Sequence, residues 1–476
     1  MLFRSEAVAY RAEPAWKPEA EMNQDSKDLL SGRGYGFKWW HEIFTERQLA
    51  ALTTFSDLVG EAIAKIRSGA ISAGLSSSAE SAEKVDLDAA SYAEFVGLYL
   101  ALAMSRFADR NNALCTWDNG PTGTKASTGG SARTASLRNL FARQAIPMVW
   151  DFGEANPFSD SGGGYNSAFE WIEPAIRGLT GTVVGYSTMA DAQNQTVSAG
   201  KVVSTDPPYY DNIGYADLSD FFYIWLRRSL KPWYPQLFCT LVVPKAEELV
   251  AAPYRHGGKE QAEKFFLAGM TSAMSNIANQ ALPAYPATIY YAFKQSETSD
   301  VAGTSSTGWE TFLEAVLQAG FAITGTWPMR TELGNRMIGS GTNALASSIV
   351  LVCRKKLESA DIITRTGFRR MLRTELAPAI KTLQMGNIQP ADMPQASIGP
   401  GMAIFSRYAN VLESDGSAMT VRTALQMINQ ALDEFQDELV GEMDSDTRFA
   451  LTWFDSFGFE VGQFGRAEDI AKARNV

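Results

Sequence analysis

Cysteine and histidine are scarce in this chain of 476 residues. Three cysteines, Cys115, Cys239 and Cys353, lie far apart, and His41 and His256 are the only histidines. Cysteines spaced in this way do not form a disulfide framework, and no group of residues has the ligand spacing of a zinc site. A Ser-His-Asp hydrolase would need one of two histidines that belong to no recognisable motif. The sequence therefore predicts neither disulfides nor a metal site.

Long apolar runs are also missing. No stretch of about 18 apolar residues occurs, and the amino terminus has no apolar core like that of a signal peptide. Apolar residues make up 45% of the chain, and its 39 glycines and 19 prolines are near average usage, which excludes disordered, collagen-like and coiled-coil chains. We therefore expect a globular, cytoplasmic protein that does not enter a membrane.

Acidic residues outnumber basic residues in the whole chain, and the basic residues are concentrated in its middle. The formal net charge is −11, from 42 basic and 53 acidic residues. Residues 411–460 hold eleven acidic and two basic residues, whereas residues 354–381 hold eight basic and three acidic, and residues 221–264 hold seven basic and four acidic. An acidic total argues against general coating of nucleic acid, so any phosphate contact is expected in the central basic segments.

The sequence pattern divides the chain into four regions. Residues 1–36 are polar without a clear period, and we expect a loosely ordered lead-in there. Residues 37–180 are mostly helical in pattern, residues 181–355 alternate strands with helices, and residues 356–476 are again helical. At about 150 residues per domain, the length allows two or three domains.

Periodicity predicts the individual elements. Helices are expected at residues 45–63, 86–107, 218–230, 260–282, 307–320 and 419–440, and strands at residues 146–150, 182–186, 202–204, 287–293, 321–327 and 347–354. In the second helix we expect a buried stripe of Phe95, Leu98, Tyr99, Leu102 and Phe107. Alternating strands and helices predict an α/β fold with a largely parallel, doubly wound sheet, and two consecutive strands at its end predict an antiparallel edge pair.

One short motif indicates a specific chemistry. Residues 204–212 read Ser-Thr-Asp206-Pro207-Pro208-Tyr209-Tyr-Asp-Asn212, after a short strand and before a helix. Asp206 can accept one hydrogen of an exocyclic amine and the carbonyl of Pro207 the other, so the nitrogen lone pair faces a methyl donor. The two prolines stiffen the loop, and Tyr209 offers an aromatic face to a base turned out of its stack. A proline-rich turn with a stray tyrosine is the alternative.

The motif and its flanks resemble a known family. Residues 206–228 read Asp-Pro-Pro-Tyr-Tyr-Asp-Asn-Ile-Gly-Tyr-Ala-Asp-Leu-Ser-Asp-Phe-Phe-Tyr-Ile-Trp-Leu-Arg-Arg, and further similar runs are found at residues 147–158, 343–348 and 398–402. These runs are similar to the large bacterial and archaeal adenine-specific DNA methylases that carry an uncharacterised N-terminal domain and, in some members, a zinc ribbon. The resemblance extends from about residue 34 to the C-terminus.

This resemblance implies a class I, Rossmann-like sheet and S-adenosylmethionine-dependent methylation of adenine in DNA, in restriction-modification or anti-phage defence. Asp206, Pro207, Pro208 and Tyr209 match the family's catalytic motif residue by residue. The family's Asp-Pro-Phe-x-Gly-x-Gly cofactor loop and zinc-ribbon cysteines do not occur in this sequence. We therefore expect the second half of the sheet, weak or no binding of S-adenosylmethionine by this chain alone, and an upstream chain or segment as partner. A catalytically silent DNA-binding portion of a split or truncated methylase is the alternative.

Residues near the motif are candidates for cofactor and base contacts. Asp191 follows the strand expected at residues 182–186, where class I methyltransferases often place an acidic residue that reaches the cofactor adenine; a solvated loop carboxylate is the alternative. Asn212 and Tyr215 are candidates for lining the base pocket, although Tyr215 could equally pack against the next helix. Residues 150–153, Trp-Asp-Phe-Gly, have a faint likeness to a nucleotide loop, with one glycine where a cradle needs several.

Basic side chains in two segments are candidates for DNA phosphate contacts. Arg227 and Arg228, followed by Lys231 and Lys245, belong to the first segment, and the arginines of residues 365–373 belong to the second. Lys and Arg engage phosphates without reading sequence. A solvated helix face is the alternative for each segment.

Overall fold

The computed structural model describes residues 14–77, 88–118, 136–160, 162–181, 183–210, 213–291, 307–330, 347–385, 393–441 and 445–458. The chain divides into two compact units. The helical unit comprises Met1–Ser187, Ile213–Glu248 and Ala252–Gly258, and the sheet unit comprises Thr188–Asn212, Leu249–Ala251 and Lys259–Val476. The chain therefore passes between the units several times.

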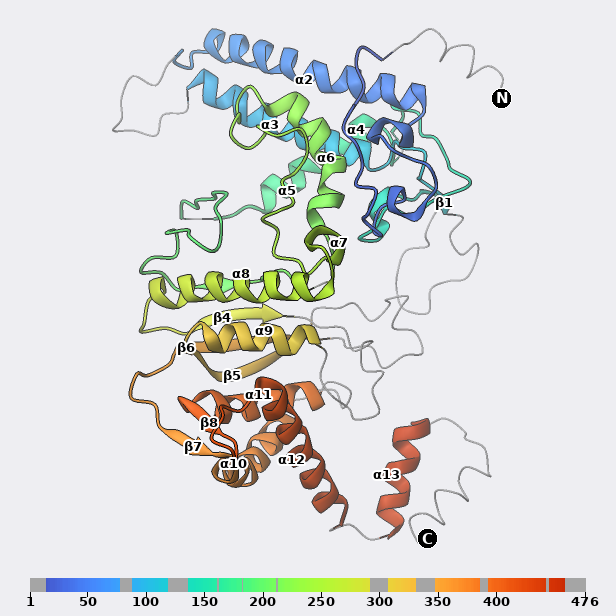
Figure 1. Ribbon diagram of the computed structural model, residues 1–476. Coiled ribbons are helices and arrows are strands. Elements are labelled where there is room, and N and C mark those ends of the chain that lie inside the picture. Colours follow the sequence, from blue (N-terminus) through green and yellow to red (C-terminus); the bar gives the residue numbers. More distant parts are fainter. Residues whose placement is uncertain are drawn as a thin grey trace. The chain divides into compact units, whose positions relative to one another are not determined.

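The helical unit is built around three packed helices, α2, α3 and α6 (Figure 1). Its elements are η1 (Ser31–Arg33), η2 (Trp40–Ile43), α2 (Glu46–Ser72), α3 (Ala89–Ala108), β1 (Trp117–Asp118), β2 (Ser136–Leu137), η3 (Leu140–Ala142), α4 (Tyr165–Glu170), α5 (Ile172–Gly178), α6 (Tyr215–Leu230) and α7 (Pro253–His256). A capping box starts α2, because the side chains of Thr45 and Gln48 each accept the other's backbone N–H. The helices predicted in these regions are confirmed.

The predicted apolar stripe of α3 is wrong for most of its members. Phe95 and Leu102 are exposed, and the buried face is made instead of small residues together with Met104 and Phe107. A Cβ at Gly97 would lie 2.4 Å from Cδ1 of Ile63 on α2. Because the two helices approach this closely, the contact face admits small side chains and turns the large ones outward.

The loosely ordered lead-in is wrong for residues 14–36. Met22, Leu29 and Leu30 are fully buried in the core of the helical unit. Leu29 also forms an isolated parallel bridge with Ile146, which is the only strand-like pairing in the segment predicted as a strand at residues 146–150. The lead-in therefore contributes to the core, and its lack of periodicity reflects irregular backbone rather than exposure.

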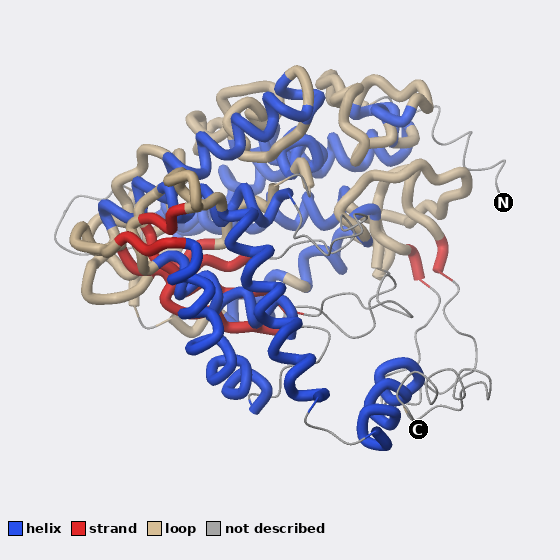
Figure 2. Tube along the Cα trace, turned by 60° about the horizontal axis from the view of Figure 1, so that its bottom comes forward, coloured by secondary structure: helices blue, strands red, loops and turns tan. Residues whose placement is uncertain are grey.

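The sheet unit contains a four-stranded mixed sheet of order β3-β4-β6-β5, whose strands lie side by side in Figure 2. Its elements are β3 (Ser204–Thr205), α8 (Lys259–Gln280), β4 (Ala287–Tyr291), α9 (Thr307–Gln318), β5 (Phe321–Arg330), β6 (Ser347–Lys355), β7 (Ile362–Thr364), α10 (Arg365–Met385), α11 (Met393–Ser406), β8 (Asn410–Leu412), α12 (Val421–Gly441) and α13 (Ser445–Phe457). The short β7 and β8 pair separately, in parallel.

Strand direction in the four-stranded sheet agrees in part with the sequence. β3 and β4 are parallel, with Thr205 opposite Ile289, and β6 is antiparallel to both β4 and β5. The predicted antiparallel pair β5–β6 is confirmed, but β6 lies inside the sheet, so β5 is the one member of the pair at an edge. The strand predicted at residues 182–186 is wrong, because residues 183–186 are irregular and strongly exposed.

Helices enclose the sheet within one apolar core. α9 packs on β5 and on α8, while α11 packs on β5 and β6 and is itself covered by α10 and α12. The run at residues 398–402 belongs to this packing. A Cβ on Gly399 would meet the side chain of Thr326 on β5, and a Cβ on Gly401 would lie 2.5 Å from Ile428 on α12. These glycines therefore permit α11 to contact the sheet and a neighbouring helix closely.

Candidate catalytic loop and basic cavity

The motif loop, residues 206–210, leaves the sheet at the carboxyl end of β3. The parallel neighbour β4 ends at the same edge, with Tyr291 as its last residue. In α/β sheets, ligands bind just beyond the carboxyl ends of such strands. Asp206 is exposed there, Pro207 is buried and Tyr209 is half-buried, so the loop presents a carboxylate and an aromatic ring from a fixed base.

Contacts within the sheet unit hold Tyr209 beside Asp206. The Tyr209 hydroxyl donates a hydrogen bond of 2.8 Å to Oδ1 of Asp206. The ring of Tyr209 packs edge-on against Tyr291, with centroids 5.1 Å apart, and Tyr291 in turn stacks on Phe312 at 3.9 Å. The aromatic cluster thus sets the position of Tyr209, and Tyr209 sets the position of one carboxylate oxygen.

The backbone after Tyr209 is strained. Tyr210 has a φ of 23°, a value that non-glycine residues seldom adopt. Its carbonyl accepts the N–H of Ala251 at 2.8 Å, and its buried ring packs against Phe266. A Cβ at Gly308, in the first turn of α9, would lie 3.0 Å from Cβ of Tyr210. Tertiary contacts therefore hold a conformation of the kind that is concentrated at functional sites.

The loop can act as an acceptor for an amine. An ionised carboxylate has two oxygens with about four lone-pair positions, and Tyr209 occupies only one position on Asp206. Asp206 can therefore accept a further N–H from a substrate while it stays bound to Tyr209. Of the residues predicted for this chemistry, the structure brings together Asp206, Pro207, Pro208 and Tyr209.

Asp191 lies in an exposed turn of the sheet unit, and its carboxylate accepts hydrogen bonds from two residues of that turn. Its Oδ1 accepts the N–H of Gln193 at 2.9 Å, and its Oδ2 accepts the side-chain amide of Asn194 at 3.0 Å. The side-chain amide of Asn276, on α8, donates a hydrogen bond to the carbonyl of Gln195 and so connects this turn to the helix. Among the described residues, the Asp191 carboxylate contacts only its own turn, which agrees with a solvated loop carboxylate.

Asn212 lies outside the described residues, and Tyr215 belongs to the helical unit. Tyr215 is the first residue of α6, and about half of its surface is exposed. Its hydroxyl accepts a hydrogen bond of 3.3 Å from the Gln144 side chain. The ring is therefore available to a ligand at this end of α6.

Three predicted cations share one cavity in the helical unit. Arg227, Arg228 and Lys231 line a cavity of about 430 Å³ together with Pro232 and Pro235. The two arginines lie in the last turn of α6, and the lysine follows immediately. The two prolines restrict the backbone of the lining after Lys231. The sequence grouped these three cations in one basic segment, and the structure shows that they line one space.

Each arginine is oriented by a contact that leaves other donors free. Nε of Arg227 donates to the carbonyl of Thr240 at 2.7 Å, and Nε of Arg228 donates to Oδ1 of Asp57 at 2.8 Å. Arg228 also lies over the ring of Trp16, at 5.1 Å from the centroid. A guanidinium carries five N–H groups, so the terminal nitrogens remain able to bind an anion.

Lys245, the fourth cation predicted to contact phosphate, is paired inside the helical unit. Its ammonium lies 2.8 Å from Oδ2 of Asp220, which is buried in α6, and also donates to the carbonyl of Val243. Burial raises the pKa of Asp220 above its usual range, although Lys245 and the N–H of Val243 act in the opposite direction. Removing Lys245 would leave a buried carboxylate without its counter-ion.

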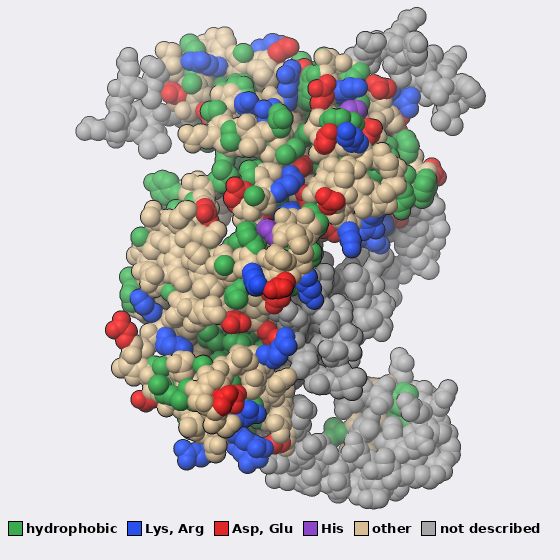
Figure 3. Space-filling model, in the orientation of Figure 1, with side chains coloured by type: hydrophobic (Ala, Val, Ile, Leu, Met, Phe, Trp, Pro, Cys, Tyr) green, Lys and Arg blue, Asp and Glu red, His purple; other side chains and the backbone are tan. Residues whose placement is uncertain are grey.

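Most of the predicted basic face of α10 is paired with acidic residues. Arg365 binds Glu413, and Arg369 and Arg373 both bind Glu434 of α12. On the face shown in Figure 3, basic and acidic side chains are likewise interspersed. The basic cavity of α6 is therefore the better candidate for phosphate contact.

The resemblance run beyond the motif contains a buried ionic cluster that sequence reasoning missed. Asp217 accepts hydrogen bonds from Asn23, Tyr254 and Arg255, and Arg255 also binds Glu248. Burial alone would raise the pKa of Asp217, but these donors outweigh it and the pKa lies below its usual value. Burial and the bond to Asp217 raise the pKa of Tyr254 to about 12. The cluster fixes the segment around α7 to α6.

The described residues contain neither a metal-binding cluster nor a membrane-spanning helix. No group of three or more His, Cys, Asp or Glu side chains there is arranged to hold a metal ion. None of the helices in those ranges combines the length and apolar character needed to cross a membrane.

Comparisons with known proteins cover only the end of the chain. A family model described as a domain of unknown function (DUF8807) matches residues 444–476, of which the structure describes residues 445–458, including α13. No curated protein and no solved structure matches the chain.

Proposed function

We propose that this chain carries the target-facing part of an adenine-specific DNA methyltransferase. The proposal depends above all on the motif loop. An Asp-Pro-Pro-Tyr sequence follows a strand of an α/β sheet, its carboxylate is exposed, and the Tyr209 ring is held 5.1 Å from the Tyr291 ring at the same sheet edge. In the sheet, β3 and β4 are parallel, and the antiparallel strand β6 lies between β4 and β5. This arrangement agrees with the class I architecture that the resemblance implies.

The proposed chemistry uses groups of this loop. Asp206 accepts one hydrogen of the adenine amine and the carbonyl of Pro207 accepts the other. Both acceptors oppose delocalisation of the nitrogen lone pair into the ring and direct it to the methyl donor. Tyr209 stacks on the base and orients Asp206 through its hydroxyl. The donor would supply the methyl group by breaking its sulfur–methyl bond and leaving as a neutral thioether, and Asp206 would accept the proton that the amine loses as the nitrogen–methyl bond forms.

S-adenosylmethionine is the methyl donor that the resemblance implies, but the described residues do not fit a complete cradle for it. Asp191 uses both carboxylate oxygens within its own turn. No strand of the sheet unit is followed by a glycine-rich loop in the ranges that the structure describes. The proposal includes an upstream chain or segment as the partner that would hold the donor.

The basic cavity supports DNA as the partner. Arg227, Arg228 and Lys231 present positive charge around one space on a chain of net charge −11. Phosphate contacts at such a site position the duplex without reading its sequence. The same observation favours the second candidate function, a DNA-binding portion without catalytic activity of its own.

Substitution of Asp206 separates these two functions. The full chain would be expressed with its flanking genes, and N6-methyladenine in the host DNA measured for the unchanged protein, for Asp206→Ala and for the exposed control Asp160→Ala. We expect Asp206→Ala to abolish methylation while DNA binding persists, because loss of a preorganised acceptor raises the barrier by about 3 kcal/mol or more. Equal methylation by all three proteins would refute the catalytic role. DNA binding without methylation by any of them would favour the silent binding portion.

A further inference from the structure

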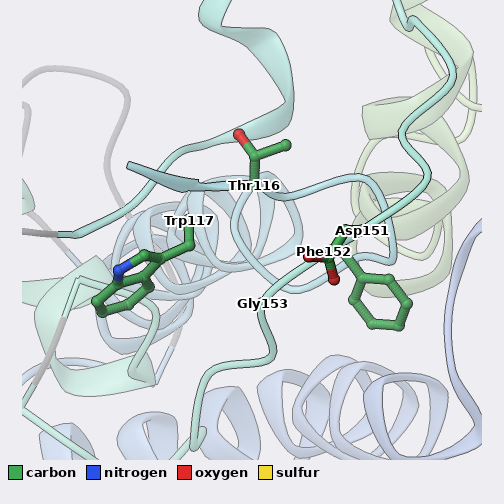
Figure 4. A pocket seen from close by; sticks show the side chains of 5 residues that line it. All are labelled: Thr116, Trp117, Asp151, Phe152 and Gly153. Carbon is green, nitrogen blue, oxygen red and sulfur yellow. The ribbon is translucent and has the colours of Figure 1, made fainter. Parts of the chain in front are cut away.

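A second cavity lies in the helical unit, away from the residues that the proposed chemistry uses. It has a volume of about 500 Å³ and is lined by Thr116, Trp117, Asp151, Phe152 and Gly153. Figure 4 shows the Trp117 and Phe152 rings on either side of Gly153, extending away from each other, with the Asp151 carboxylate beside Phe152. Small-molecule sites have volumes of about 300–1,000 Å³ and combine aromatic walls with a few polar groups.

The two aromatic rings and the carboxylate of this cavity are exposed in the part of the chain that the structure describes. Trp117 is 59% exposed and Phe152 is 40% exposed, although aromatic rings of this size usually bury most of their surface. The Asp151 carboxylate has no ion-pair or hydrogen-bond partner among the described residues. The neighbouring Asp118, in contrast, is paired with Arg138 at 2.9 Å. The cavity therefore offers two ring faces and one free acceptor group.

The backbone around the cavity is fixed. The N–H of Gly153 donates to the carbonyl of Cys115 at 2.8 Å, so the two segments that line the cavity are joined directly. A Cβ on Gly153 would lie 2.7 Å from the side chain of Leu137, which explains the glycine at this position. Glu154, the next residue, is held by Arg47 and Thr45 of the α2 start. The lining is thus preorganised, as a binding site requires.

We propose that this cavity binds a nucleobase that carries an exocyclic amine, with adenine as the reference ligand. Trp117 and Phe152 supply faces for base stacking, which tolerates any base. Asp151 would distinguish adenine from thymine. Its carboxylate can accept a hydrogen bond from the amine of adenine. Thymine has a carbonyl oxygen at the corresponding position, and two acceptors that face each other cannot form a hydrogen bond. The Thr116 hydroxyl can donate to a ring nitrogen.

The base could belong to a free adenosyl compound or to an unpaired strand of DNA, and these sources share the same recognition chemistry. The inference does not depend on methyl transfer, because the cavity contains none of residues 206–210. Its test is therefore direct binding to the full chain, with no second component. Adenine binding that persists in Asp206→Ala but is lost in Trp117→Ala would belong to this cavity and not to the motif loop, so failure of this inference and failure of the proposed function are distinguishable.

Binding would be measured by calorimetry with adenosine, S-adenosylmethionine, thymidine, oligo-dA and oligo-dT. We expect adenine probes to bind more tightly than their thymine counterparts. Trp117→Ala should weaken adenine binding about tenfold or more, and Asp151→Asn should reduce the preference for adenine over thymine. Matched controls are Trp171→Ala, an exposed tryptophan outside the cavity, and Asp160→Asn. All four substituted side chains are exposed, so folding should be retained.

The outcomes identify the source of the base or overturn the inference. Tight binding of adenosine or S-adenosylmethionine that Trp117→Ala abolishes would assign the cavity to a free adenosyl compound. Tight binding of oligo-dA alone, with the same sensitivity, would assign it to an unpaired strand. Equal binding of adenine and thymine probes would overturn the inference. So would adenine binding that Trp117→Ala and Asp151→Asn leave unchanged.

Discussion

The hydroxyl of Tyr209 donates a hydrogen bond to the carboxylate of Asp206 across 2.8 Å, so two residues of the same short motif orient each other. The prolines between them restrict the backbone, and the contact of Tyr209 with Tyr291 restricts the ring. The hydrogen bond therefore links the aromatic face proposed for base stacking to the acceptor proposed for the amine.

Tyr209→Phe and Tyr209→Ala separate the two roles of this side chain. The phenylalanine keeps the ring but frees Oδ1 of Asp206, so we expect a loss of methylation of about tenfold or less. The alanine also removes the stacking face, which contributes about 1–3 kcal/mol per base, and should cost about a further tenfold to hundredfold. Single-turnover methylation rates in the complemented assembly are the measurement. Equal losses for the two variants would show that the ring itself has no role.

Gly308→Ala tests whether contacts from α9 hold the motif loop. The added Cβ would lie 3.0 Å from Tyr210, so the tyrosine must shift. We expect methylation to fall by about tenfold or less, because the shift of Tyr210 is a few tenths of an ångström, smaller than the misplacement of about 1 Å that costs about a hundredfold. The control is Gly325→Ala in β5, where an added Cβ meets nothing within 4 Å. Full activity of Gly308→Ala would mean that the strained conformation of Tyr210 is not required.

Charge reversal in the basic cavity tests the phosphate contact. Arg227→Glu combined with Lys231→Glu should weaken DNA binding for all sequences alike. It should also reduce the salt dependence of binding, since each lost phosphate contact lowers the slope of the logarithm of the binding constant against the logarithm of the salt concentration by about one. Arg228 is left unchanged because it also binds Asp57. Arg369→Glu with Arg373→Glu, on a helix face already paired with Glu434, is the control. A change in the preferred DNA sequence, without a change in the salt dependence of the binding constant, would contradict the phosphate role.

Asp217→Asn should destabilise the helical unit. The substitution removes the charge that faces buried Arg255, and breaking a buried pair costs about 3–5 kcal/mol. Chemical denaturation is the measurement, and Glu173→Gln, which breaks an exposed pair with Arg177, should change stability by less than about 1 kcal/mol. A loss for Asp217→Asn no larger than for this control would show that the cluster is not a stabilising element.

The same carboxylate gives a pH dependence of defined sign. The folded state lowers the pKa of Asp217, so its contribution to stability is present above the unfolded pKa of about 4 and is lost as the pH falls through the lower folded pKa. The unchanged protein should therefore lose stability in acid more steeply than Asp217→Asn. Parallel acid denaturation curves for the two proteins would contradict this assignment.

The sequence by itself determined the local elements and the motif. The 3.6-residue pattern placed α2, α6, α8 and α9, and β-branched runs placed β4, β5 and β6. The Asp206–Tyr209 motif could likewise be identified at the end of a strand, because all these features depend on neighbouring residues. Helical spacing alone did not identify the buried face of α3. Its close contact with Ile63 is a property of two helices that are separated in sequence.

Only the tertiary structure decided which side chains meet. The insertion of β6 between β4 and β5, the strain at Tyr210 and the pairing of Lys245 with Asp220 all depend on residues far apart in the chain. The same holds for the grouping of Trp117 with Asp151, since neither sequence neighbourhood contains a signal for the other. Long-range packing and exposure, unlike helix and strand periodicity, have no fixed spacing in sequence, so the chain must fold before they can be read.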